Sequence, residues 1–160
     1  MNKMMDFTTA AAEQEGFIVN TTQSLVRLVT VNYNPELVKE APDGMMVPGE
    51  ESKVVSYVEK FFEKEGIRSQ KFGYYPREDI VAVIGRGEEG RKKLILPTHS
   101  DVVPSGNGWT VTRNPFFPFV KDGYIYGRGT TDNKGQMAAC MAMARMLKPY
   151  EDQIAGQVIF

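Results

Sequence analysis

The fold is organised around two stretches, LILPTHSDVVP at residues 94–104 and DGYIYGRGTTDNKG at residues 122–135. The first predicts a buried strand that leads into His99, the only histidine of the chain. In extended backbone, residues two apart face the same side, so His99 and Asp101 can act as a pair. The second stretch predicts a tight glycine turn that opens a helix, with Asp132 at the junction. We interpret His99 and Asp132 as metal ligands and Asp101 as the group that orients the imidazole.

The composition allows one globular domain with a substantial core. The chain has 160 residues, of which 42% are hydrophobic. Its 19 basic and 20 acidic residues nearly cancel, so no global charge would recruit nucleic acid or an anionic membrane. Cys140 is the sole cysteine, and we expect a small buried thiol rather than a disulfide or a nucleophile. No apolar run has the length of a signal peptide or a membrane span, so a cytoplasmic protein is expected.

Upstream of residue 94 the hydrophobic pattern changes from helices to strands. Helical spacing predicts an amphipathic helix over about residues 9–31 and a second from about residue 50 to Gly66. A long surface connection with several prolines joins them. Strands are predicted over residues 67–75 and 80–84, the latter as a continuous buried run.

Residues 85–90, GRGEEG, match the glycine spacing of a dinucleotide-binding loop. Such a loop must open into a helix whose N-terminus receives the pyrophosphate. Here the third glycine runs into the next predicted strand, and Glu88 and Glu89 would repel phosphate. The sequence therefore favours a hairpin turn, with a nucleotide-binding domain kept as an alternative.

Downstream of the His99 segment, Trp109 and the phenylalanines that follow it are expected to pack the loop under the site. Residues 124–126 predict a short strand, and residues 133–147 predict a helix ended by Pro149. Residues 157–160 begin a further buried strand. Together these elements predict an α/β fold with a mixed sheet flanked by helices.

Each candidate residue also has a simpler explanation. A single histidine is more often structural than a ligand, Asp132 could cap a helix, and Lys134 could be a surface charge. The combination carries more weight, because His99 and Asp101 follow the carboxyl end of a predicted strand, where open α/β sheets place their ligand sites. A metal-bound histidine also donates its second N–H to a carboxylate or carbonyl.

These residues resemble a known family, the dinuclear zinc exopeptidases and deacylases that include acetylornithine deacetylase, succinyl-diaminopimelate desuccinylase, glutamate carboxypeptidase and several dipeptidases. The resemblance is carried, in order and spacing, by HSDVVP at 99–104, Trp109, Pro115-Phe116, Asp122-Gly123 and YGRGTTDNKG at 126–135. It implies that His99 binds one zinc, Asp132 bridges two zinc ions and Asp101 supports the histidine. It also implies a cis peptide bond between Asp132 and Asn133.

The implied activity is hydrolysis of amide bonds in dipeptides or N-acyl amino acids, with Zn²⁺, Co²⁺ or Mn²⁺ as the metal. In the family, a pair of adjacent glutamates follows the strand that begins here near Gln157, and a further acidic ligand, a distant histidine and a lid and dimerisation domain come later; none of these is found in this sequence. A catalytic zinc normally has three protein ligands, so residues 1–160 are expected to be the N-terminal part of a catalytic domain and to be inactive alone. The resemblance also implies that the complete enzyme can form a homodimer. The alternative is a non-catalytic fragment or pseudoenzyme module that packs against a partner.

Overall fold

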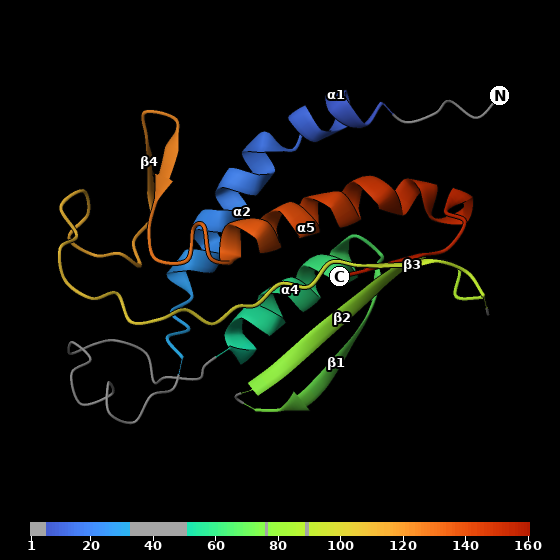
Figure 1. Ribbon diagram of the computed structural model, residues 1–160, viewed down its shortest axis with the longest axis horizontal. Helices are drawn as coiled ribbons and strands as arrows, with labels where there is room; N and C mark the ends of the chain where they lie inside the picture. Colours follow the sequence, from blue (N-terminus) through green and yellow to red (C-terminus); the bar gives the residue numbers. More distant parts are fainter. Residues whose placement is uncertain (1–5, 33–50, 76, 89) are drawn as a thin grey trace.

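The computed structural model describes residues 6–32, 51–75, 77–88 and 90–160. Along these residues a group of helices comes first, then a run of strands, then two further helices and a last strand (Figure 1). The helices are α1 Phe7–Ala12, α2 Glu15–Arg27, α4 Ser52–Lys64, α5 Lys134–Leu147 and the 3₁₀ helix η1 Lys148–Gln153. The strands are β1 Arg68–Tyr74, β2 Arg77–Gly85, β3 Lys93–Ile95, β4 Phe119–Lys121, β5 Tyr124–Tyr126 and β6 Gln157–Ile159.

Four of the strands form a mixed sheet in the spatial order β1, β2, β6, β3. β2 pairs antiparallel with β1 on one side and with β6 on the other, where Val83 lies opposite Ile159. β3 pairs parallel with β6, with Ile95 also opposite Ile159. β4 and β5 form a separate antiparallel ribbon. The predicted mixed sheet with flanking helices is therefore confirmed.

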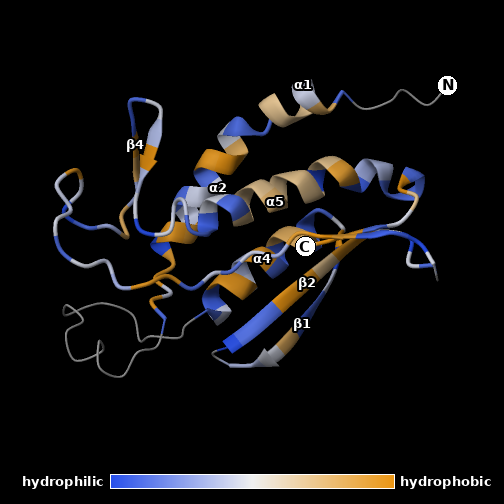
Figure 2. Ribbon diagram, viewed as in Figure 1, coloured by the Kyte–Doolittle hydropathy of each residue, from blue (hydrophilic) through white to orange (hydrophobic). Residues whose placement is uncertain are grey.

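Helices α2, α4 and α5 share one hydrophobic core with β2. Figure 2 shows β2 changing from hydrophilic at its Arg77 end to hydrophobic toward Gly85, and the hydrophobic half is the part that reaches this core. The buried members of the core are Leu25, Val54, Val58, Phe61, Phe62, Ile67, Ala82, Ile84, Ala138, Met141 and Ala144. None of the helices in the described ranges is long and apolar enough to cross a membrane.

The single helix predicted over residues 9–31 is wrong in two respects. The chain forms two helices, α1 and α2, and α2 ends at Arg27 because Leu28 is already extended, with ψ of 98°. Beyond this point Val31 forms a parallel bridge with Val102. Tertiary pairing thus overrides the helical spacing of the last apolar residues. The predicted connection lies almost entirely outside the described residues, which resume at residue 51.

The hairpin predicted at residues 85–90 is also wrong, because β6 lies between β2 and β3 and the loop joins two strands that do not pair. The glycine spacing has a structural explanation at Gly85, whose φ is +95° where the chain leaves β2. The loop leads into β3 and not into a helix. The nucleotide-binding alternative therefore lacks the helix N-terminus that would receive a pyrophosphate.

The strand predicted at residues 94–96 is present, but the prediction that it is buried is wrong. Leu94 is 54% exposed and Ile95 is 62% exposed. β3 is an edge strand of the described sheet, so its apolar run has a neighbour on one side only. The other strands agree more closely with prediction, and the α-helix ends at Leu147 as expected, although η1 carries a helical path past Pro149.

Candidate metal centre

His99 follows the carboxyl end of β3 and is held from two sides by carboxylates. Its Nδ1 lies 3.1 Å from Oδ1 of Asp101 and 3.2 Å from the backbone oxygen of the same residue. Its Nε2 lies 2.9 Å from Oδ1 of Asp132. The structure therefore brings together the three side chains that the sequence singled out.

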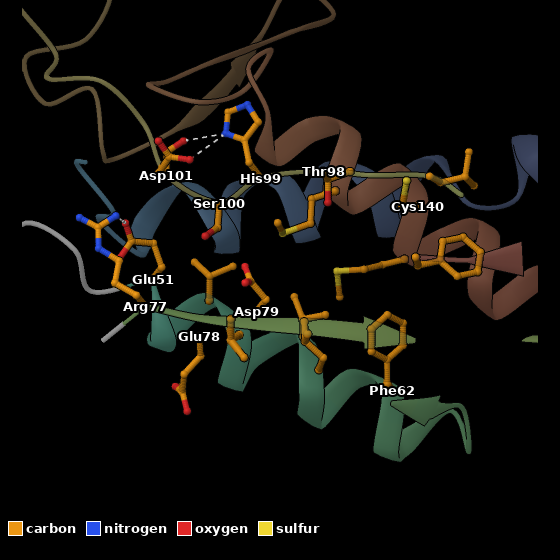
Figure 3. A pocket seen from close by; sticks show the side chains of 18 residues that line it. Glu51, Phe62, Arg77, Glu78, Asp79, Thr98, His99, Ser100, Asp101 and Cys140 are labelled. Atoms are coloured by element: carbon orange, nitrogen blue, oxygen red, sulfur yellow. Dashed lines mark hydrogen bonds and ion pairs between the residues drawn. The ribbon is translucent and has the colours of Figure 1, made fainter. Parts of the chain in front are cut away.

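The segment that carries His99 is extended, as the sequence predicted. Figure 3 shows His99 and Asp101 on one side of this segment and Ser100 on the other, where it faces a cavity of about 360 Å³. The segment is fixed by backbone pairing with the residues that follow α2, because the Val102 N–H donates to the Thr30 oxygen at 2.8 Å. The Thr30 hydroxyl also donates to the backbone oxygen of Ser100. The orientation of His99 thus depends on a segment that is distant in the sequence.

Asp132 lies one residue before the N-cap of α5, which is Asn133. The helix-capping explanation for Asp132 is therefore wrong, because the cap position comes one residue later and Asp132 faces His99 instead. The peptide bond between Asp132 and Asn133 is cis, as the family resemblance implied. Asn133 makes no capping hydrogen bond, and its Oδ1 accepts the backbone N–H of His99 at 3.4 Å.

Lys134 is fully buried beneath this centre, so the surface-charge explanation for it is wrong. Its ammonium donates to the backbone oxygen of Leu28, where α2 ends. The turn before α5 packs tightly here, because a Cβ on Gly129 would lie 2.8 Å from Cγ1 of Val102. With φ at +88°, Gly129 lets the turn approach the His99 segment in a way that a larger residue would prevent.

The hydrogen-bond pattern assigns the two ring nitrogens of His99 different roles. Nδ1 faces two acceptors on Asp101, and Nε2 faces Oδ1 of Asp132. A proton on Nδ1 would leave Nε2 for a cation or a second proton. Burial lowers the pKa of His99, but the hydrogen bond to Asp132 and the charge of Asp101 together outweigh it, so the net pKa is raised above 6.5. A metal ion at Nε2 would take the place of that second proton.

The distance between His99 and Asp132 suits two ligands of one ion after a small adjustment. Tetrahedral zinc with ordinary bond lengths places a nitrogen and an oxygen ligand about 3.4 Å apart. The observed separation is 2.9 Å, and the side chains are 49% and 82% exposed, so both have room to open. No group of three or more His, Cys, Asp and Glu side chains in the described ranges could hold a metal. The pair therefore fits part of a metal site.

Residues 95–160, which include all three candidate side chains, match the model of peptidase family M20/M25/M40. The match covers the C-terminal part of the chain, from β3 to the last residue, and the relatives and solved structures that resemble the chain include a desuccinylase and an M20 family metallo-carboxypeptidase. M20 family metallopeptidases use divalent metals, typically zinc. The match over residues 95–160 therefore agrees with the interpretation of His99 and Asp132 as candidate metal ligands.

Individual M20 relatives match the chain over different lengths. It is 45% identical over 69 residues to a succinyl-diaminopimelate desuccinylase of Zymomonas mobilis, a match that covers 43% of this chain and 17% of the relative. Human carnosine dipeptidase 1 superposes with a TM-score of 0.66 at 19% identity, over 95% of this chain and 32% of that one. An M20 family metallo-carboxypeptidase of Sulfolobus solfataricus gives 0.64 at 18% identity, over 89% and 29%. The two structures show a shared α/β fold.

The chain spans 17% to 26% of the length of the curated relatives it matches. The matched part nevertheless holds the complete His99, Asp101 and Asp132 arrangement. Because the match covers only part of the relatives, the activity, substrate and partners of the intact protein are treated below as proposals.

Sequence reasoning missed two asparagines beside the candidate metal centre. Asn133 holds the backbone of His99, and the Nδ2 of Asn32 donates to Oδ2 of Asp101 at 3.3 Å. The first had a local signal, since it directly follows Asp132. The second had none, because 69 residues separate it from Asp101.

The buried ammonium of Lys134 makes a prediction about stability. Burial lowers the pKa of Lys134 to about 8, although the Asp101 carboxylate opposes the shift. Between this value and the ordinary 10.5 the unfolded state binds one more proton than the folded state, so this group makes the free energy of unfolding rise with pH. The rise should total about 3 kcal/mol.

We expect Lys134→Met to remove this rise, because methionine has no ammonium to desolvate. Urea unfolding of the metal-free wild type and variant at pH 8 and pH 10.5 measures the change in the free energy of unfolding between the two pH values. Lys121→Met, at an exposed position, should keep the pH dependence of the wild type. Equal slopes for wild type and Lys134→Met would contradict the burial of a charged lysine.

Proposed function

We propose that this chain is part of a metal-dependent hydrolase that cleaves amide bonds in dipeptides or N-acyl amino acids. The observation that carries the proposal is the placement of His99, with Asp101 on Nδ1 and Asp132 on Nε2. The M20 match over residues 95–160 supports hydrolysis of peptide-like substrates, and the names of the desuccinylase and the dipeptidase that resemble this chain support the substrate class.

In this proposal each side chain has a separate role. His99 would hold a metal ion through Nε2, and Asp132 would hold it through its carboxylate. Asp101 keeps the Nδ1 proton in place, which leaves the Nε2 lone pair available and prevents the ring from rotating. When bound, the metal supplies Lewis acidity that lowers the pKa of water and polarises the substrate carbonyl.

We further propose that residues 1–160 form the N-terminal portion of the catalytic domain and lack amidase activity by themselves. Two ligands are fewer than the three protein ligands of a typical catalytic zinc. The greater length of the curated relatives supports the presence of further polypeptide in the functional enzyme. A lid and dimerisation domain, a homodimeric state and a cytoplasmic location belong to this proposal.

The test uses the full-length protein and the 160-residue chain side by side. Zinc titration by calorimetry is followed by amidase assays on a panel of dipeptides and N-acetyl and N-succinyl amino acids. We expect the full-length protein to bind zinc and cleave at least one substrate class, and the 160-residue chain to cleave none. Zinc-free, inactive full-length protein would refute the hydrolase and favour a non-catalytic module that packs against a partner.

The nucleotide-binding alternative can be tested in the same preparation. The loop at residues 85–90 leads into β3, which gives a pyrophosphate no helix N-terminus. We therefore expect no thermal shift on addition of NAD or ATP. A clear shift would revive that alternative.

A further inference from the structure

We propose that Asn32 is a positioning residue of the metal centre, which acts through Asp101 to hold the imidazole of His99. This inference rests on the proposed function, because it assigns Asn32 a part in presenting the metal-binding nitrogen. Neither the family resemblance nor the sequence pattern pointed to this residue. Its role follows from a chain of contacts that runs from the end of α2 to His99.

The position of Asn32 is fixed by its backbone. Its N–H donates to the backbone oxygen of Val102 at 2.8 Å, and one residue earlier Val31 forms a parallel bridge with Val102. On the other side, Val102 donates to Thr30 at 2.8 Å. These bonds form a short parallel ladder directly beside Asp101. The side-chain amide of Asn32 is therefore presented to Asp101 from a rigid backbone.

The two oxygens of Asp101 are occupied by different partners. Oδ1 lies 3.1 Å from Nδ1 of His99, and Oδ2 accepts from Nδ2 of Asn32 at 3.3 Å. The terminal torsion of an aspartate is broad, so one hydrogen bond alone does not fix the plane of its carboxylate. A donor on each oxygen fixes that plane. Asn32 thereby keeps Oδ1 directed at the imidazole.

The charge distribution around Asp101 makes an amide the suitable partner. The buried Lys134 ammonium acts on Asp101 electrostatically from below, and His99 approaches it from the other side. An amide N–H orients the free oxygen without adding a further positive charge. An aspartate at position 32 would instead place a second carboxylate against Asp101, where like charges repel.

The experiment measures zinc affinity of the full-length protein by competition with a chromophoric chelator. We expect Asn32→Asp to weaken zinc binding about tenfold, within the range found when an outer partner of a metal ligand is lost. Asn32→Leu, which removes the donor without adding charge, should show a smaller loss in the same direction. Asn20→Asp repeats the chemical change at an exposed position of α2 and should leave affinity unchanged.

A double-mutant cycle with Asp101→Asn distinguishes positioning from a general structural role. If Asn32 acts through Asp101, Asn32→Leu should have little further effect once Asp101 has lost its carboxylate. The absorption spectrum of the Co²⁺-substituted protein should change in the same way in Asn32→Leu and Asp101→Asn. Additive losses, or a spectrum unchanged by Asn32→Leu, would overturn the inference.

The outcomes also separate this inference from the proposed function. If wild type binds no zinc, the hydrolase proposal fails and this inference fails with it. If wild type binds zinc and both Asn32 variants bind it equally well, the inference alone is overturned. If both variants lose their fold by circular dichroism, Asn32 is a structural residue and the inference is again overturned.

Discussion

Replacing Asp132 with alanine is expected to weaken zinc binding by more than a hundredfold and to abolish amidase activity of the full-length protein. Loss of an outer partner already costs about 10-fold to 100-fold in metal affinity, so loss of a carboxylate that we propose as a direct ligand should cost more. The fold should survive, because the Asp132 side chain is 82% exposed and its only described partner is His99. Calorimetric zinc titration and thermal unfolding measure the two effects separately.

A suitable control is Asp152→Ala, which removes another exposed aspartate. Asp152 pairs with Arg86 at 3.2 Å, away from the metal centre. Exposed pairs of this kind contribute about 0–1 kcal/mol, so both zinc binding and stability should stay close to wild type. An Asp132→Ala protein with wild-type zinc affinity would show that the ion, if one binds, does not use this carboxylate.

Replacing Gly85 with alanine is expected to lower the free energy of unfolding by about 3 kcal/mol or more. A Cβ at this position would lie 2.2 Å from the backbone oxygen of Gly156, which immediately precedes β6. The residue also has φ of +95°, a conformation that alanine rarely adopts. Strain and collision therefore act together, and the pairing of β2 with β6 should open. Urea unfolding followed by circular dichroism measures the loss.

The matched control for this change is Gly106→Ala. Gly106 also has positive φ, at +67°, but nothing lies within 4 Å of its would-be Cβ. The free energy of unfolding of Gly106→Ala should fall only by the cost of placing alanine at positive φ, about 1 kcal/mol. Equal losses at the two glycines would mean that β6 does not approach the end of β2 as closely as described.

The arrangement of the metal centre could be predicted because its parts are encoded at short range. His99 and Asp101 are two residues apart in extended backbone, which places them on one side. Asp132 stands at the junction of a glycine turn and a helix, and the family motif links the two stretches. The structure confirms that these side chains meet. Their roles as metal ligands stay predictions.

The order of the strands in the sheet could not be predicted. The spacing of apolar residues indicates that a strand has a buried face, but it does not indicate which strand lies beside it. Residues 85–90 therefore suggested a hairpin, whereas β6 arrives from much later in the chain to separate the two strands. The same limit explains the exposure of Leu94 and Ile95, whose apolar character does not reveal an edge position.

Two side chains near the centre show how tertiary contacts decide a residue's role. Lys134 has the sequence surroundings of a surface residue, yet it is buried because the end of α2 supplies a carbonyl for its ammonium. Asn32 follows a predicted helix, and its contact with Asp101 exists because the chain after α2 pairs with Val102. Neither contact can be predicted from the residues next to it in the sequence.

The order of the strands has a consequence for synthesis on the ribosome. β1 and β2 can pair as soon as both have emerged, since they are neighbours in the chain and in the sheet. Within the described sheet, β3 has no paired neighbour until Gln157–Ile159 has been translated, because β6 is the strand that joins it to β2 and β1. During that interval Leu94 and Ile95 lack the backbone pairing that β6 later supplies. The pace of translation between β3 and β6 therefore sets how long the nascent chain displays an unpaired apolar strand.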